Sequence, residues 1–182
     1  ISVKFVIKMI KDKLDRQFEY LRISVTDKCN FRCIYCMPKE IFGSKHQFLK
    51  KNELLTYEEI IEVAKTLKPF GLKKIRLTGG EPLLRKNIEY LVEGLKKEAL
   101  IDKVMITTNG SLLTKAKLVS LKKGGLDSVT ISLDASSQKV GNIINPVNNN
   151  HVLVSEAIDN VISVFNSVKV NMVVIKGIND IE

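Results

Sequence analysis

Short apolar runs alternate with longer amphipathic segments along the 182 residues of this chain. Each short run is rich in β-branched or aliphatic residues and is bounded by turn-forming residues, a pattern typical of buried strands. On this basis we predict five strands, at Leu21–Thr26, Lys73–Thr78, Lys103–Thr107, Ser128–Leu133 and Val168–Ile175.

The segments between these runs have the periodicity of helices. Thr56 and Glu59 form a capping-box pattern that predicts the start of a first helix, and Gly71 predicts its end. A third helix is predicted from about Thr114 to Lys123, before two glycines. Apolar residues at helical spacing predict the buried faces of three helices: Ile60, Ala64 and Leu67 in the first, Ile88, Leu91, Val92 and Leu95 in the second, and Ile158, Val161, Ile162 and Phe165 in the fourth.

Strands that alternate with helices predict right-handed βαβ units and a parallel sheet. A closed eight-unit barrel uses roughly 31 residues per unit, or about 250 in all. Five strands cannot close such a barrel, so the predicted fold is α/β, a partial, open TIM-type βα barrel; an open doubly wound sheet is the alternative. We expect residues 1–20 to be an N-terminal extension and residues 21–182 to form the core domain.

The first and last residues add an expectation about length. The chain begins with Ile1 rather than Met, and its last predicted strand would expose a long apolar edge, which proteins usually avoid. Both features favour a chain that is part of a longer protein.

Composition is ordinary for a globular protein, with 45% hydrophobic and 27% charged residues. No run of about 18 apolar residues predicts a membrane span. The net charge of +9 comes from 29 Lys and Arg against 20 Asp and Glu, and it indicates either an anionic partner or a solvated lysine-rich surface. Because the lysines form no single stripe and lack interleaved aromatic residues, we predict no nucleic-acid partner.

All the cysteines of the chain, Cys29, Cys33 and Cys36, lie within eight residues. An odd, clustered set argues against a disulfide framework and favours a metal site in a reducing cytoplasm. Iron–sulfur clusters take thiolate ligands, and a set of three rather than four would leave one iron open to a small molecule. The alternatives are structural zinc, which needs a fourth ligand although the nearest histidine, His46, is ten residues on, and inert thiols.

Polar motifs follow three of the predicted strands. Gly79-Gly80-Glu81-Pro82 follows the second, Thr107-Thr108-Asn109-Gly110 ends the third, and Ser132 and Asp134 end the fourth. Turns and helix caps would explain each motif by itself. Because the carboxyl ends of barrel strands gather at one face, the motifs together favour a ligand site there.

Three cations interrupt the apolar strands: Arg22, Arg76 and Lys169. A buried charge needs a partner, so each must face solvent or meet an anion. A triphosphate would satisfy all three, since guanidinium groups suit phosphate oxygens.

The segment from Leu21 to Pro38, which contains the three cysteines, resembles the signature of the radical S-adenosylmethionine superfamily. More narrowly, the chain is similar to the GTP 3′,8-cyclase family, also called molybdenum cofactor biosynthesis protein A. The resemblance covers roughly residues 12–182. Five further motifs occur in the family's order, at residues 54–60, 75–85, 107–110, 129–134 and 168–179.

The resemblance implies a lyase that converts GTP to (8S)-3′,8-cyclo-7,8-dihydroguanosine 5′-triphosphate. In this family a [4Fe-4S] cluster on Cys29, Cys33 and Cys36 reduces S-adenosylmethionine to methionine and a 5′-deoxyadenosyl radical. No acid–base catalytic residue is implied. By resemblance, Tyr35, Gly80 and Ser132 contact S-adenosylmethionine, and Arg22, Arg76, Thr107 and Lys169 contact GTP.

The resemblance also implies an external electron donor and a downstream cyclic pyranopterin monophosphate synthase, and it leaves a homodimer open. Family members hold a second cluster on three C-terminal cysteines, whereas this sequence has none after Cys36. The asparagine-rich segment Ala135–His151 departs from the family pattern, so no site is assigned to it. The alternatives are another radical enzyme, acting on a peptide or a haem precursor, and a non-enzymatic metal-binding module.

Overall fold

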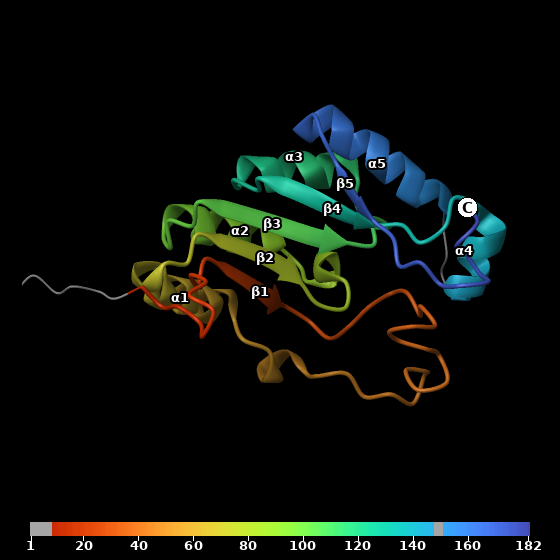
Figure 1. The fold of residues 1–182 in the computed structure, drawn as a ribbon, viewed down its shortest axis with the longest axis horizontal. Helices are drawn as coiled ribbons and strands as arrows, with labels where there is room; N and C mark the ends of the chain where they lie inside the picture. Colours follow the sequence, from red (N-terminus) through yellow and green to blue (C-terminus); the bar gives the residue numbers. More distant parts are fainter. Residues whose placement is uncertain (1–8, 148–150) are drawn as a thin grey trace, which may run out of the picture.

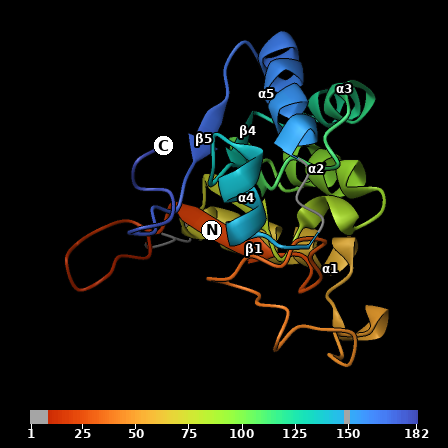
Figure 2. The same ribbon diagram turned by 90° about the vertical axis from the view of Figure 1, so that its right-hand side faces the viewer.

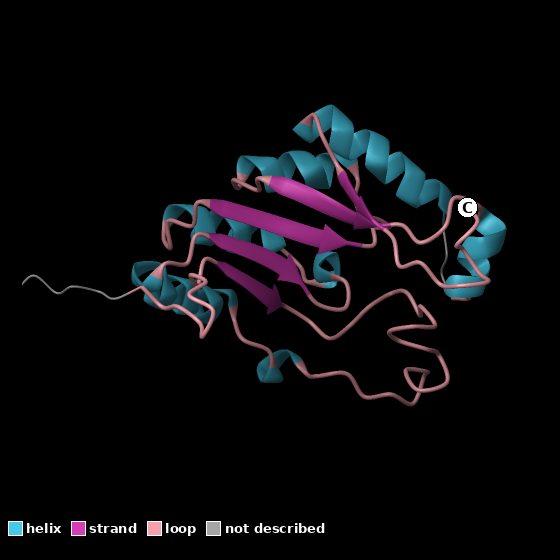
Figure 3. Cartoon of the chain, viewed as in Figure 1, coloured by secondary structure: helices cyan, strands magenta, loops and turns pink. Residues whose placement is uncertain are grey.

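A computed structural model describes residues 9–147 and 151–182 (Figure 1). Its centre is one parallel sheet with the strand order β1-β2-β3-β4-β5, in which neighbours in the sequence are neighbours in the sheet. All the arrowheads in Figure 3 therefore point to the same edge. The strands are β1 (Tyr20–Ser24), β2 (Lys74–Thr78), β3 (Lys103–Thr108), β4 (Ser128–Ser132) and β5 (Lys169–Asn171).

Helices follow the strands in the alternation that the sequence predicts. The α-helices are α1 (Tyr57–Leu67), α2 (Ile88–Lys97), α3 (Lys115–Lys123), α4 (Gln138–Ile144) and α5 (His151–Phe165), with short 3-10 turns at Lys51–Glu53, Lys68–Phe70 and Pro82–Leu84. Figure 2 shows α1, α2, α3 and α5 on one side of the sheet. Sequential parallel strands with helices on one side form an open α/β sheet, which confirms the predicted partial barrel.

The hydrophobic core lies between the sheet and these four helices. Alternate residues of the central strands, such as Ile75, Leu77, Val104 and Ile106, are fully buried there. Each such side chain contributes about 1.5–3 kcal/mol relative to an exposed one. The residues between them, including Arg76 and Thr107, lie on the opposite face, which no helix of the described residues covers. The sheet therefore has one apolar face and one polar face.

The predicted helix signals are confirmed at α1 and α2. The side chains of Thr56 and Glu59 each accept a hydrogen bond from the backbone N–H of the other residue, at 3.2 and 2.7 Å respectively. Gly71 adopts a left-handed backbone conformation (φ 111°) and ends the 3-10 turn that follows α1. The predicted apolar face of α2 is fully buried.

In the second half of the chain one helix was missed and two predictions are wrong in detail. The segment Ala135–His151 contains α4, which sequence analysis missed because Gly141 and Asn142 are weak helix formers. On α5, Ile162 is 46% exposed and does not face the core. The strand predicted at Val168–Ile175 is only three residues long.

The short β5 has a visible cause. The backbone N–H of Val173 donates to Asp134 Oδ1 at 2.9 Å, and the carbonyl of Val173 accepts from Asn179 Nδ2 at 2.8 Å. These side chains hydrogen-bond to the N–H and carbonyl groups of Val173, which a longer strand would pair with β4. No helix in the described parts of the chain is long and apolar enough to cross a membrane.

Candidate functional site

The three cysteines lie on the long loop that leaves the carboxyl end of β1. Cys29, Cys33 and Cys36 line one cavity of 420 Å³, together with Asp27 and Gly80. All three are free thiols. Across residues 9–147 and 151–182, no three His, Cys, Asp or Glu side chains form a group that could hold a single metal ion. The structure thus places the three thiols around one shared cavity and not around the position of a single metal ion.

Backbone turns and one arginine shape this loop. The N–H groups of Cys36 and Met37 both donate to the Cys33 carbonyl, at 3.1 and 2.9 Å, so the chain turns tightly between the last two cysteines. Arg32 donates from Nε to the Phe42 carbonyl and from Nη1 to the Cys29 carbonyl, each at 2.7 Å. Sequence analysis missed this role of Arg32, which ties the start of the loop to its middle.

The thiols lie in surroundings that favour their protonated form. Burial, followed by the neighbouring Cys36, Asp134 and Cys29, raises the pKa of Cys33 to about 12. Burial also raises the pKa of Cys29 and of Cys36. The positive charge of iron reverses this preference, because metal ligation deprotonates a thiol.

A cluster and an attached cofactor fit this donor set. Asp27 Oδ1 is buried without a hydrogen-bond partner among the described residues, and Asp27 lines the same cavity as the cysteines. An acceptor left unpaired beside three thiols suits a bound group that carries a donor, such as an ammonium group.

The Gly79-Gly80 run packs directly on the cysteine loop. The N–H groups of Gly80 and Glu81 donate to the carbonyls of Thr26 and Lys28, both at 2.7 Å. A Cβ atom on Gly80 would lie 2.2 Å from the Lys28 carbonyl oxygen. Glycine is therefore required by the close approach of two backbones, and the predicted contact with S-adenosylmethionine stays a prediction.

Glu81 links the ends of two strands. It is buried, and its carboxylate accepts hydrogen bonds from Thr108 Oγ1 and the Asn109 N–H at 2.7 Å and from the Leu83 N–H at 3.0 Å. Burial raises the pKa of Glu81, and the three donors oppose this effect. Its role was missed in the sequence; the signal was a carboxylate amid apolar residues directly after a strand.

The predicted motif at the end of β3 also reaches the cysteine loop. Asn109 Nδ2 donates to Asn30 Oδ1 at 2.9 Å and lies 3.9 Å from Cys29 Sγ. The motif is thus more than a turn, because it supports the loop that carries the cysteines.

Tyr35, Ser132 and Asp134 meet in a second, smaller cavity of 60 Å³, which Cys33 also lines. The Tyr35 hydroxyl donates to Asp134 Oδ2 at 2.6 Å. Burial, followed by this hydrogen bond, raises the pKa of Tyr35. The structure therefore brings together two of the residues predicted to contact S-adenosylmethionine, while Gly80 lines the cavity next to it.

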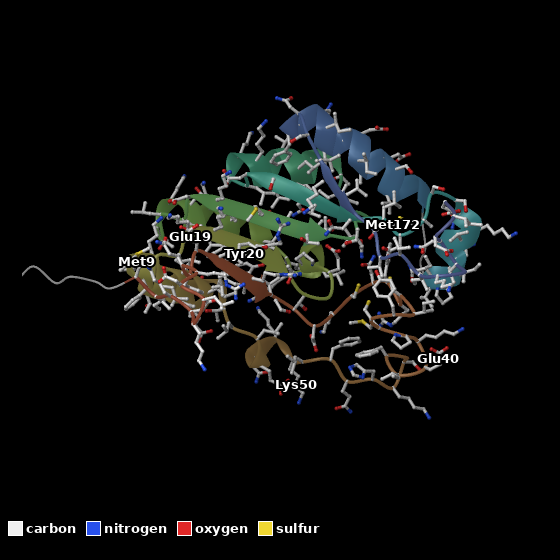
Figure 4. The ribbon with its side chains drawn as sticks, viewed as in Figure 1. Met9, Glu19, Tyr20, Glu40, Lys50 and Met172 are labelled. Carbon is white, nitrogen blue, oxygen red and sulfur yellow. The ribbon has the colours of Figure 1, made fainter. Side chains whose placement is uncertain are left out.

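The residues predicted to contact GTP all lie on the polar face of the sheet. Arg22 is the register partner of Arg76, and Thr130 is the partner of both Thr107 and Lys169. The guanidinium group of Arg76 donates to the hydroxyls of Tyr20, Thr107 and Thr130, at 2.6, 3.1 and 2.8 Å. Figure 4 labels Tyr20 on β1 and Met172 just after β5. These two strands form the edges of this face.

The polar face carries three cations that no acidic side chain among the described residues pairs with. Arg22 and Lys169 are exposed and Arg76 is half-buried. In the described part of the chain none of the three forms an ion pair with a carboxylate. By contrast, Lys73, Lys96 and Lys97 each form an ion pair with an acidic side chain. The polar face therefore favours an anionic ligand.

Curated relatives cover almost the whole chain. It is 50% identical over 173 residues to a GTP 3′,8-cyclase of Staphylococcus epidermidis, which corresponds to 95% of this chain and 51% of that protein. The GTP 3′,8-cyclase of Staphylococcus haemolyticus is 49% identical over 175 residues, or 96% and 51%. The chain thus spans about half the length of the curated relatives it matches.

Solved structures show the same fold. Streptococcus suis SuiB bound to S-adenosylmethionine has a TM-score of 0.69 at 21% identity, over 86% of this chain and 34% of that chain. BtrN in complex with AdoMet and 2-DOIA has a TM-score of 0.52 at 26% identity, over 67% and 48%. The family profile described as the Radical SAM superfamily matches residues 23–182, which include the cysteine loop and β2 to β5. The chain belongs to the radical S-adenosylmethionine superfamily.

Proposed function

We propose that this chain is the radical-generating part of a GTP 3′,8-cyclase, which converts GTP to (8S)-3′,8-cyclo-7,8-dihydroguanosine 5′-triphosphate in molybdenum cofactor biosynthesis. One observation carries the proposal: a cavity lined by three thiols lies at the carboxyl edge of a sheet whose polar face presents cations that form no ion pair within the described residues. The relatives at about 50% identity, all named GTP 3′,8-cyclase, support it.

Cys29, Cys33 and Cys36 would hold a [4Fe-4S] cluster. When bound, the cluster supplies the electron that cleaves S-adenosylmethionine. The task of the chain is to hold this cofactor and orient it: Tyr35 and Ser132 bind it from the smaller cavity, and Gly80 binds it from the cavity of the cysteines. Two similar structures, SuiB and BtrN, are described with S-adenosylmethionine or AdoMet bound, which supports this assignment.

GTP would bind along the polar face through Arg22, Arg76, Thr107 and Lys169. Three hydroxyl groups hold Nε and Nη1 of the Arg76 guanidinium, so little side-chain entropy is lost when this group meets a phosphate. A ligand on this face lies next to the carboxyl edge of the sheet, where the cysteine loop begins (Figure 3).

The wider assignment follows from the same proposal. Residues 1–20 are an extension and residues 21–182 the core domain. The complete enzyme would hold a second cluster in a further region, take its electron from an external donor in the cytoplasm, and pass its product to a cyclic pyranopterin monophosphate synthase. A homodimer fits this assignment.

Anaerobic reconstitution tests the cluster. We expect about four irons per chain, and far fewer in the variant Cys36→Ser. Zinc in place of iron, or the same iron content in the variant, would contradict the proposal and favour a structural metal-binding module.

Product analysis tests the substrate. With S-adenosylmethionine and dithionite, 5′-deoxyadenosine should form much faster when GTP is present than when it is replaced by ATP. Equal formation with and without GTP would contradict the cyclase and favour a radical enzyme that acts on another substrate.

A further inference from the structure

The carboxyl end of α4 holds the cysteine loop on both sides of Cys33. Asn145 Oδ1 accepts a hydrogen bond from the backbone N–H of Arg32 at 2.8 Å. The carbonyl of the preceding residue, Ile144, accepts one from the N–H of Ile34 at 2.9 Å. A segment about 110 residues away in the sequence thus fixes the backbone next to the central cysteine.

The Arg32 contact also determines how the Asn145 amide is oriented. Only the oxygen of the amide can accept from an N–H group, so Nδ2 must point the other way. Asn145 is 4% exposed, and its Nδ2 is buried without a partner in the part of the chain that the structure describes. Buried amide donors in native proteins almost always have a partner, so this one indicates a water or a ligand.

The surroundings of Asn145 indicate which. Asn145 lines the smaller cavity with Cys33, Tyr35 and Ser132. That cavity shares Phe31 and Cys33 with the larger cysteine cavity. Its 60 Å³ accommodates the edge of a ligand whose remainder lies in the 420 Å³ space next to the thiols.

We propose that Asn145 is a positioning residue with two tasks: Oδ1 holds the cysteine loop around Cys33, and Nδ2 donates a hydrogen bond to S-adenosylmethionine. This inference rests on the proposed function, because it assumes that S-adenosylmethionine occupies the two adjoining cavities. The cofactor offers suitable acceptors in its adenine nitrogens, ribose oxygens and carboxylate.

Two substitutions separate the tasks. Asn145→Asp keeps the acceptor for the Arg32 N–H and removes the donor, whereas Asn145→Leu removes both. Asn142→Asp makes the same chemical change at an exposed position of α4 and serves as the control. Measurements at about pH 8 keep an introduced carboxyl group largely ionised, so that it does not regain a donor.

Iron content and the electron paramagnetic resonance signal of the reduced cluster report on the loop without the cofactor. Equilibrium dialysis with S-adenosylmethionine reports on the donor. For Asn145→Asp we expect the iron content of the unmodified protein and a Kd about tenfold higher. For Asn145→Leu we expect reduced iron as well, and for Asn142→Asp no change in either quantity.

The outcomes distinguish the two tasks from the proposed function. An unchanged Kd in Asn145→Asp would assign Nδ2 to an ordered water and overturn the donor role. Full iron content in Asn145→Leu would overturn the holding role, and circular dichroism melting shows whether that variant is folded. Failure of the unmodified, reconstituted protein to bind S-adenosylmethionine would overturn the proposed function instead.

Discussion

At the scale of single residues, the close packing of the cysteine loop requires that Gly80 has no Cβ atom. The added Cβ of Gly80→Ala would overlap backbone atoms of Lys28, which cannot rotate away. We expect the free energy of unfolding to fall by about 1–3 kcal/mol and the retained iron per chain to fall with it. Thermal melting and iron analysis measure both. Gly124→Ala, whose nearest backbone contact would be 3.1 Å, should lose less stability and no iron.

Arg76 gives a residue-scale test of the polar face. Arg76→Lys keeps the charge and loses the fork that meets three hydroxyl groups, so we expect the Kd for GTP to rise about tenfold with little change in melting temperature. Isothermal titration calorimetry measures the affinity. Lys103→Ala removes an exposed cation at the amino end of β3 on the same face. If Lys103→Ala raised the Kd while Arg76→Lys left it unchanged, net charge rather than the Arg76 fork would determine affinity.

At the scale of elements, the capping box of α1 is a sequence signal with a measurable effect. Thr56→Ala leaves the N–H of Glu59 without its partner, which we expect to cost about 1 kcal/mol and to lower the melting temperature by about 2–4 °C. Thr66→Ala, in the last turn of the same helix and exposed, should stay within about 0.5 kcal/mol of the unmodified protein. A similar loss in both variants would show that the cap contributes nothing special.

The elements also show what the sequence could and could not predict. Elements with strong local signals were predicted well: β2, β3 and β4 lie within one residue of their predicted bounds, and the apolar face predicted for α2 is fully buried. The misses involve contacts distant in sequence: β5 ends early because Asp134 accepts from the Val173 N–H, and α4, which contains weak helix formers, ends at Asn145, which accepts from the Arg32 N–H. Periodicity contains no information on such contacts.

The candidate site follows the same division. Its cysteines and strand-end motifs could be found from residue type and spacing. Its supporting groups could not, because Arg32, Glu81 and Asn145 act through backbone atoms of residues that the fold brings close. Arg32 and Asn145 have no feature that marks them in a sequence, and Glu81 is marked only by its carboxylate in the motif that follows β2.

At the scale of the whole molecule, the two faces of the sheet contribute differently to stability. One face is covered by helices and buries the apolar core, so it determines the stability of the fold. The other face has Arg22, Arg76 and Lys169 with no ion-pair partner in the described residues, and their like charges repel one another. A ligand with several negative charges would relieve this repulsion, so ligand binding should stabilise the protein.

If GTP binds on this face as proposed, its affinity should depend on salt. Exposed charges are screened over about 8–10 Å at physiological ionic strength and over about 3 Å at 1 M. We therefore expect the Kd for GTP, measured by calorimetry, to rise at least about tenfold between 0.05 and 1 M sodium chloride. Guanosine has no phosphate groups, so its weaker binding should change little over the same range. A Kd for GTP that does not vary with salt would show that the triphosphate does not lie on the cationic face.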